Sequence, residues 1–241
     1  MKKKNNIICI VQARMGSKRL LGKSMKAILG KPMIYYCFYQ LKFSKLIDEM
    51  MLATSTLPDN DEMAKYVSSM GIEAFRGSED DVLARFVEAT KKCADDDIIV
   101  RITGDEPLIE PFIVDAVIKD HLKKKADYTS TKLVRTIPQG MDLEIFPKKV
   151  LLKIASLANT EFDKEHVTPY IYNHPNDFII NAYQSKKSFA IKPVLTVDVL
   201  EEFELIRKII EGVYQEGKPM KAAQILKFIK KNKLPFEPTK S

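Results

Sequence analysis

The sequence predicts an α/β fold: a Rossmann-like, mostly parallel sheet with helices on both faces and an inserted α+β subregion. Short apolar runs alternate with helical patterns through the first 125 residues, which is the order that produces a parallel sheet. The apolar run Ile98–Val100 is unbroken, as expected of a strand that is buried on both faces. One helical pattern has an apolar stripe made of Met63, Tyr66, Val67 and Met70.

The elements follow a regular order up to residue 125. Strands are expected at 6–13, 49–54, 72–75 and 97–102, because each is a short apolar run. Helices are expected at 33–43, 61–70, 80–92 and 111–124. The third of these helices repeats the apolar stripe with Val82, Leu83, Phe86 and Val87.

The order is less regular from residue 126 onward. Strands are expected at 127–130, 143–146, 177–183 and 194–197, with a turn at Pro138-Gln139-Gly140 and the last strand returning to the sheet. Helices are expected at 148–158, 163–172, 201–215 and 220–233. We interpret residues 1–241 as one domain, with a subregion at about 126–190 that serves substrate binding and dimerisation.

The composition is that of a globular protein, with 45% hydrophobic and 29% charged residues among 241. The apolar stretch Ile7–Val11 is too short for a secretory signal and far below the ~20 residues that span a bilayer. The three cysteines, Cys9, Cys37 and Cys93, are too widely spaced for a zinc site and odd in number. We therefore expect a cytoplasmic protein with buried, reduced cysteines and no membrane partner.

The net charge of +7 lies at the two ends of the chain. Residues 1–4 carry +3 and residues 218–241 carry +6, so subtracting both from +7 leaves −2 for residues 5–217. The segment Met220–Lys233 is expected to be an amphipathic helix, with Ala223, Ile225, Leu226 and Ile229 packed on the domain and its lysines solvated. A membrane surface or a nucleic acid is the alternative partner for those lysines, but no aromatic residues interleave with them, so no nucleic-acid partner is expected.

The loop after the first strand carries the strongest functional signal. Its four cations are Arg14, Lys18, Arg19 and Lys23, and its glycines are Gly16 and Gly22. Ligands of open α/β sheets bind where parallel strands end, and four cations at that place predict a polyphosphate. The alternative is a solvated basic loop. The loop is not a Walker A motif, because five residues separate the glycines and Pro32 ends any helix that follows.

Two aspartates, Asp105 and Asp198, are candidate ligands for a Mg²⁺ cofactor. Asp105 follows the expected strand at 97–102, and Asp198 follows the one at 194–197. If both strands are parallel, both carboxylates reach the edge of the sheet that holds the basic loop. Mg²⁺ binds oxygen ligands, commonly one or two carboxylates plus substrate phosphates. The alternative role for each aspartate is to cap a helix N-terminus, and it is more plausible for Asp198, which precedes the helix at 201–215.

The loop and three later motifs resemble the cytidylyltransferases that activate acidic sugars, among them the octulosonate and acylneuraminate enzymes. The matching segments are 12–23, 30–33, 75–83 and 101–105, and they look most like the spore-coat-polysaccharide branch. Leu21 departs from the family's usual proline but leaves every cation in place, and Glu106 matches the octulosonate type. The resemblance implies CTP and an acidic sugar as substrates, pyrophosphate as a product, and a homodimer.

The resemblance also implies roles for particular residues. Lys23 would stabilise the α-phosphate, Arg14 and Arg19 would bind the leaving phosphates, and Asp105 would act with them in catalysis. The nucleotide would further contact Ala13, Gly16, Ser17, Arg76, Ser78 and Gly104. The sugar would contact Asp142, Glu144 and His166. From the residues alone, a solvent-facing position for Asp142 and Glu144, and purely structural roles for Ser78 and His166, are the alternatives.

Two other functions stay open at this stage. One is a nucleotidyltransferase that uses a sugar phosphate as acceptor or another nucleoside triphosphate as donor. The other, more distant, is a P-loop-like NTPase or a basic binding protein without transferase chemistry. Pyrophosphate release that depends on an acceptor sugar would exclude the second group.

Overall fold

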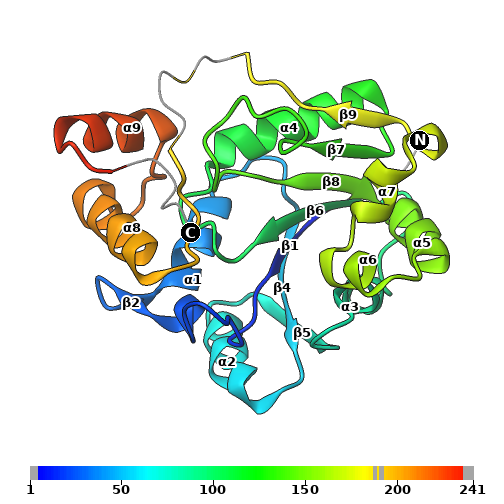
Figure 1. The fold of residues 1–241 in the computed structure, drawn as a ribbon, viewed down its shortest axis with the longest axis horizontal. Helices are drawn as coiled ribbons and strands as arrows, with labels where there is room; N and C mark the ends of the chain where they lie inside the picture. The colour runs from blue at the N-terminus through cyan, green and yellow to red at the C-terminus, as the bar shows by residue number, and fades with distance from the viewer. Residues whose placement is uncertain (1–4, 187–188, 190–192, 236–241) are drawn as a thin grey trace.

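The computed structural model describes residues 5–186, 189 and 193–235, and it shows a seven-stranded sheet of order β5-β4-β1-β6-β8-β7-β9 (Figure 1). The strands of this sheet are β1 (Ile7–Gln12), β4 (Glu49–Ser55), β5 (Glu73–Gly77), β6 (Ile98–Thr103), β7 (Tyr128–Ser130), β8 (Glu144–Pro147) and β9 (Ile180–Ala182). A separate hairpin pairs β2 (Ala27–Ile28) with β3 (Lys31–Pro32).

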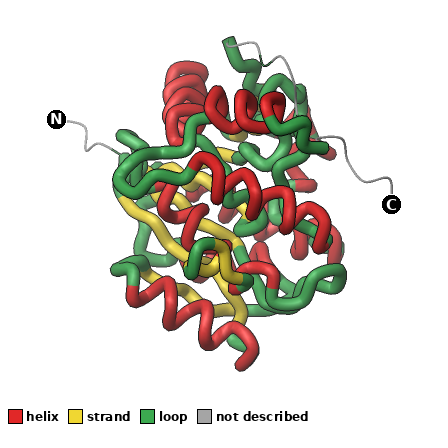
Figure 2. Tube along the Cα trace, turned by 90° about the vertical axis from the view of Figure 1, so that its left-hand side faces the viewer, coloured by secondary structure: helices red, strands yellow, loops and turns green. Residues whose placement is uncertain are grey.

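Helices enclose the sheet, as the view turned by 90° shows (Figure 2). They are α1 (Met33–Leu41), α2 (Asp61–Ser69), α3 (Val82–Ala89), α4 (Pro111–Lys124), α5 (Lys148–Leu157), α6 (Glu161–His166), α7 (Pro169–Asn173), α8 (Leu200–Val213) and α9 (Ala222–Lys231). Short 3₁₀ turns lie at Lys23–Met25, Pro58–Asn60 and Pro175–Asp177.

Pairing within the sheet confirms the predicted fold class. β1 pairs in parallel with β4 and β6, β4 pairs in parallel with β5, and β7 pairs in parallel with β9. β8 is the exception, because it runs antiparallel between β6 and β7. The first 125 residues thus form the parallel half, and the second half completes the sheet with a reversed strand.

Alternate residues of β1 show how the sheet divides the core. Ile7, Cys9 and Val11 pack on the side covered by α1, α4 and α8. Ile8 and Ile10 pack on the opposite side, with α3 and α5. Successive strand side chains point to opposite faces, so an unbroken apolar strand requires helices on both.

The segment 194–197 is not a strand of the sheet, and this part of the prediction was wrong. Only Val194 forms a bridge, a parallel one with Gln139. The segment passes very close to the backbone of Gly140: a Cβ added at that glycine would lie only 2.4 Å from the carbonyl carbon of Leu195. The N–H of Val197 donates to the carbonyl of Asp105 (3.0 Å), so the chain still returns to the carboxyl end of β6.

The helix expected at 163–172 is two short helices. Val167 between them has a φ of +71°, which ends α6, and Pro169 begins α7 without a backbone N–H to donate. The strand expected at 177–183 is shorter than predicted, because Pro175–Asp177 forms a 3₁₀ turn. The turn expected at Pro138-Gln139-Gly140 is present, closed by a hydrogen bond from the N–H of Met141 to the carbonyl of Pro138 (3.3 Å), and it lies within a longer loop between β7 and β8.

The C-terminal helix α9 packs on the domain as expected. Ala222, Ile225 and Ile229 are its buried residues, whereas Ala223 is exposed, contrary to the prediction. Cys9 and Cys37 are buried and Cys93 is half-buried, and all three are free thiols. In the part of the chain that the structure describes, no helix has the length and apolar character needed to cross a membrane.

Candidate active site

Two cavities open at the carboxyl end of β1 and β6. The first has a volume of about 360 Å³ and is lined by the loop after β1. The second has a volume of about 630 Å³ and lies toward β7, β8 and the helices α6 and α7. Four residues line both cavities: Gln12, Thr103, Asp105 and Asp198. The two cavities therefore adjoin, with the carboxylates of Asp105 and Asp198 between them.

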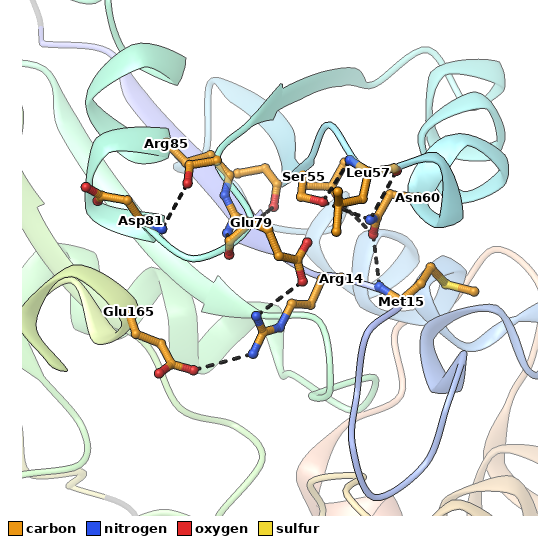
Figure 3. Close-up of polar contacts among 12 residues, drawn as sticks. Arg14, Met15, Ser55, Leu57, Asn60, Glu79, Asp81, Arg85 and Glu165 are labelled. Carbon is orange, nitrogen blue, oxygen red and sulfur yellow. Dashed lines mark hydrogen bonds and ion pairs between the residues drawn. The ribbon is translucent and has the colours of Figure 1, made fainter. Parts of the chain in front are cut away.

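Backbone hydrogen bonds close the loop after β1 on itself. The carbonyl of Met15 accepts from the N–H groups of Ser17 (2.9 Å) and Gly22 (3.2 Å). Gly22 has a φ of +65°, which favours glycine. The N–H of Met15 donates to Asn60 Oδ1 (2.9 Å), which anchors the loop to the segment after β4 (Figure 3). Ala13, Gly16, Ser17 and all four predicted cations line the first cavity.

Lys23 lies between the two aspartates. Its Nζ is 2.9 Å from Asp198 Oδ1 and 3.6 Å from Asp105 Oδ2, and it donates to the carbonyl of Val197 (2.5 Å). Arg19 Nη2 lies 2.8 Å from Asp198 Oδ2. The structure thus brings together the basic loop and both aspartates, although Asp198 reaches this place without a preceding strand.

The side chain of Asp198 does not cap helix α8. The carboxylate of Glu202 accepts from the N–H groups of Asp198 (2.6 Å) and Val199 (3.3 Å), so Glu202 occupies the helix terminus. The carboxylate of Asp198 faces Lys23 and Arg19 instead. The capping alternative is therefore excluded by the position of the side chain.

The donors at Asp105 and Asp198 suit a magnesium ion. Asp105 Oδ1 is buried and has no hydrogen-bond partner, although a buried carboxylate oxygen ordinarily has one. Two carboxylates at the wall of a cavity lined with cations match the way Mg²⁺ is bound together with substrate phosphates. Among the described residues no group of three or more His, Cys, Asp or Glu side chains could hold a metal alone.

Arg14 crosses the mouth of the first cavity and joins two separate elements. Its Nη1 lies 3.2 Å from Glu79 Oε1, in the segment between β5 and α3. Its Nη2 lies 3.4 Å from Glu165 Oε1 on α6 (Figure 3). The guanidinium is partly exposed, so an anionic ligand can replace either carboxylate.

Arg85 of α3 also lines the first cavity and is almost fully buried. Its guanidinium donates to the carbonyls of Ala53 (3.4 Å) and Glu79 (3.0 Å), and its Nε has no partner. Burial lowers the pKa of Arg85 to about 10, although the nearby carboxylate of Glu79 acts in the opposite direction. No sequence pattern marked this residue, because it is a single arginine on the buried, largely apolar side of α3.

Arg76 and Ser78 do not line either cavity, contrary to the expectation that they reach the nucleotide. Arg76 donates to the carbonyls of Ser55 (3.1 Å) and Leu57 (3.0 Å) and pairs with Asp61 (2.6 Å). Ser78 Oγ accepts from the N–H of Asp81 (3.0 Å) just before α3. Both side chains therefore hold turns in place, as the structural alternative for Ser78 predicts.

Glu144 is buried at the base of the second cavity. It accepts hydrogen bonds from Tyr128 and from Thr168 (2.6 Å), and it forms an ion pair with Arg101. Burial alone would raise the pKa of Glu144, but Arg101 and then Lys132 lower it to about 2. Glu144 is thus held as a carboxylate at neutral pH.

Asp142 and His166 line the same cavity as Glu144. Asp142 is buried just before β8 and lies 3.0 Å from Arg135 Nη1, which excludes the solvent-facing alternative for it and for Glu144. The ring of His166 contacts Phe162 edge-on, with 4.5 Å between the ring centroids.

Glu106 is a buried carboxyl group behind the same wall. It accepts from the N–H of Asp142 (3.0 Å) and from the hydroxyl of Thr103 (3.3 Å). Burial, with further contributions from the charges of Asp142 and Asp105, raises the pKa of Glu106 well above its usual range.

Sequence reasoning missed most of the second cavity. Its unpredicted polar residues include Arg101, Tyr128, Lys132, Arg135 and Thr168. Arg101 carried a usable signal, because an arginine inside an otherwise apolar strand is rarely buried without a partner. The others are isolated in the sequence and meet only through the fold.

Comparison with known proteins finds one matching family model and several proteins of similar sequence and structure. A family model described as cytidylyltransferase matches residues 8–229. The spore coat polysaccharide biosynthesis protein SpsF of Bacillus subtilis is 30% identical over 234 residues, which cover 95% of each chain. The 3-deoxy-manno-octulosonate cytidylyltransferase of Geobacter sulfurreducens is 27% identical over 237 residues, covering 86% of this chain and 88% of the relative. A solved cytidylyltransferase from Leptospira borgpetersenii is 28% identical, with a TM-score of 0.89 and 99% of each chain covered.

Proposed function

The chain belongs to the cytidylyltransferase family, and we propose that it transfers CMP from CTP to an acidic sugar with release of pyrophosphate. Family membership makes it a CTP-dependent nucleotidyltransferase. The observation that carries the proposal is the pair of adjoining cavities that share Asp105 and Asp198. An acidic sugar as acceptor is supported by the octulosonate cytidylyltransferase among the relatives, and a role in polysaccharide synthesis by the spore-coat relative.

The first cavity is proposed to hold the triphosphate. Lys23, Arg14 and Arg19 each pair with a carboxylate across this cavity, so each has its cation at the place where phosphate oxygens would lie. Lys23 would neutralise charge that develops on the α-phosphate, and the two arginines would bind the leaving pyrophosphate. Fixed cations of this kind lower a barrier because they need no reorganisation during the reaction.

Asp105 and Asp198 are proposed to hold Mg²⁺, because Asp105 Oδ1 is buried without a partner and Asp198 faces the same cations. The ion would supply positive charge at the phosphates and at the attacking oxygen. Lys23 lies between the two carboxylates and, together with Arg19, balances their charge. A phosphate group would compete for Lys23 and leave both carboxylates available.

The second cavity is proposed to hold the sugar. A sugar hydroxyl that enters from this side meets the α-phosphorus at the boundary that Asp105 and Asp198 form. A bond forms between the hydroxyl oxygen and the α-phosphorus, the bond to the β-phosphate breaks, and the hydroxyl proton is released. The protein's contribution is to place the two reactants against one another, which can supply much of the rate enhancement.

The proposal is tested by measuring pyrophosphate release with CTP and a panel of octulosonic and nonulosonic acids. We expect release only when an acid is present, with formation of the matching CMP-sugar by mass spectrometry. CTP should be turned over faster than UTP, GTP or ATP. Pyrophosphate or phosphate release without an acceptor would indicate an NTPase, and release only with sugar phosphates would indicate a different transferase; either result would contradict the proposal.

A further inference from the structure

We infer that Lys132 binds the carboxylate of the acceptor sugar and selects acidic over neutral acceptors. The inference rests on the proposed function, because it assigns a residue to the acceptor of that reaction. Lys132 lies two residues beyond the end of β7 and lines the second cavity but not the first.

The backbone leading into Lys132 is held in place. Its own N–H donates to Ser130 Oγ at the end of β7 (3.1 Å). The neighbouring Thr131 is buried, and its hydroxyl donates to Asp142 Oδ1 (3.1 Å) and accepts from the N–H of Leu143 (3.1 Å). The lysine side chain therefore leaves a fixed point of the cavity wall, although the side chain itself is exposed.

Every carboxyl group that lines the second cavity is already compensated. Glu144 pairs with Arg101, and Asp142 pairs with Arg135. Asp105 and Asp198 face Lys23, and Asp198 also faces Arg19. Glu106 is buried, and its carboxyl oxygens accept hydrogen bonds from the N–H of Asp142 and the hydroxyl of Thr103.

Lys132 is the cation of this cavity that remains unmatched. Of the three lysine and arginine side chains that line it, Arg101 and Arg135 are paired. The ammonium of Lys132 has no hydrogen bond or ion pair to any residue that the structure describes. Lys132 lines the same cavity as the buried carboxyl groups of Glu106 and Glu144. The cavity thus has a positive charge that an anionic ligand would neutralise.

The position of Lys132 indicates the acceptor rather than the nucleotide as its partner. The phosphates have their own cations in the first cavity, which Lys132 does not line. Leu133, Phe162 and Tyr172 are exposed and line the second cavity with it. Apolar groups around a ligand would exclude water from an ion pair there and strengthen it, and they suit the carbon-bound faces of a sugar ring.

The experiment compares Lys132→Met with the wild type, using the sugar acid that the wild type turns over best and the carboxamide of that same acid. For the acid, we expect the variant's KM to rise roughly 10- to 100-fold, the range expected for a lost hydrogen bond to a charged group. The KM for CTP should not change. Lys132→Arg should restore part of the loss, and Lys91→Met, which changes an exposed lysine outside both cavities, should have no effect.

The carboxamide makes the test specific for the charge. The wild type should bind the carboxamide about as weakly as the variant binds the acid. Lys132→Met should not raise the KM for the carboxamide any further, which is the coupling that a double-mutant cycle measures. If Lys132→Met changes the KM for acid and carboxamide by the same factor, or for neither, the inference is wrong while the proposed function stands. If the wild type turns over no acid at all, the proposed function fails and the inference fails with it.

Discussion

Arg14 and Arg19 of the first cavity differ from Arg101 and Glu144 of the second in both burial and partners. Arg14 and Arg19 are 34% and 63% exposed, and they pair with carboxylates that belong to other elements around the opening. Arg101 and Glu144 are 7% and 5% exposed, and they pair directly on neighbouring strands of the sheet. Phosphate groups can displace the carboxylates that pair with Arg14 and Arg19. The pair formed by Arg101 and Glu144 is part of the folded protein and does not depend on a ligand.

This difference predicts different costs for substitutions in the two regions. An exposed ion pair adds little to stability, so a change at Arg14 or Arg19 should alter catalysis or binding and leave the fold intact. A buried pair becomes very unfavourable when one partner is removed, so a change at the base of the second cavity should reduce stability first.

Arg101→Met should destabilise the protein by about 3–5 kcal/mol, because it leaves the buried carboxylate of Glu144 without its cation. Urea or thermal unfolding monitored by circular dichroism measures the loss. The double variant Arg101→Met with Glu144→Gln should recover part of it, since the unpaired charge is gone. A loss below about 1 kcal/mol for the single variant would remove the contrast between the two regions.

Lys23→Ala should reduce kcat by ~10²–10³ with little change in melting temperature. The lysine lies on the loop after β1, and its partners are carboxylates that a ligand would also contact. Pyrophosphate release and a thermal melt of the same sample separate the two effects. A variant that melts far below the wild type, or that retains its kcat, would show that Lys23 serves the fold rather than the reaction.

Acid should destabilise the second cavity through Glu144. Its folded-state pKa of about 2 lies below the ordinary value of 4.5, so its contribution to stability is complete above pH 4.5 and is lost as the pH falls toward 2. The free energy of unfolding of the wild type should fall by on the order of 2 kcal/mol more across this window than that of Glu144→Gln. Equal pH dependence of the two proteins between pH 4.5 and 2 would show that Glu144 is not a paired carboxylate.

Glu165→Gln should have the smallest effect, a decrease of a few-fold in the KM for CTP. The carboxylate of Glu165 lies 3.4 Å from Arg14 across the mouth of the first cavity, where it competes with the phosphates. An exposed pair of this kind is worth about 1 kcal/mol or less. The matched control is Glu161→Gln, on the same helix but outside both cavities. A higher KM for CTP in Glu165→Gln would mean that Glu165 helps rather than hinders binding.

The two cavities also differ in how far they could be predicted from the sequence. The parallel half of the sheet and the phosphate loop were predictable, because apolar runs, helical spacing and clustered cations such as Arg19 and Lys23 are local in the chain. Asp105 was predictable because it follows a strand at once. Asp198 was placed correctly near it, but as the residue that follows a strand at 194–197, and that segment is not a strand: it reaches this place by passing close to Gly140.

The second cavity was predicted only in part, for a physical reason. Its residues come from β6, β7, β8 and α6, and the reversed pairing of β8 brings them together. Glu144 was identified through a resemblance, but its partner Arg101 lies 43 positions away along the chain. Arg76 and Ser78 stand in a polar turn after a strand, a pattern that predicts a ligand site, but their side chains hydrogen-bond to nearby backbone and line neither cavity.

The central claim is that Asp105 and Asp198 join the two cavities into one magnesium-dependent reaction. The most direct measurement is a Mg²⁺ titration of acceptor-dependent pyrophosphate release for Asp105→Asn and Asp198→Asn, beside thermal melts of both. We predict that each variant needs more Mg²⁺ for half-maximal rate and has a lower kcat, at an unchanged melting temperature. A normal Mg²⁺ dependence in both variants would contradict the claim, and a normal dependence in Asp198→Asn alone would leave Asp105 as the single ligand from this chain.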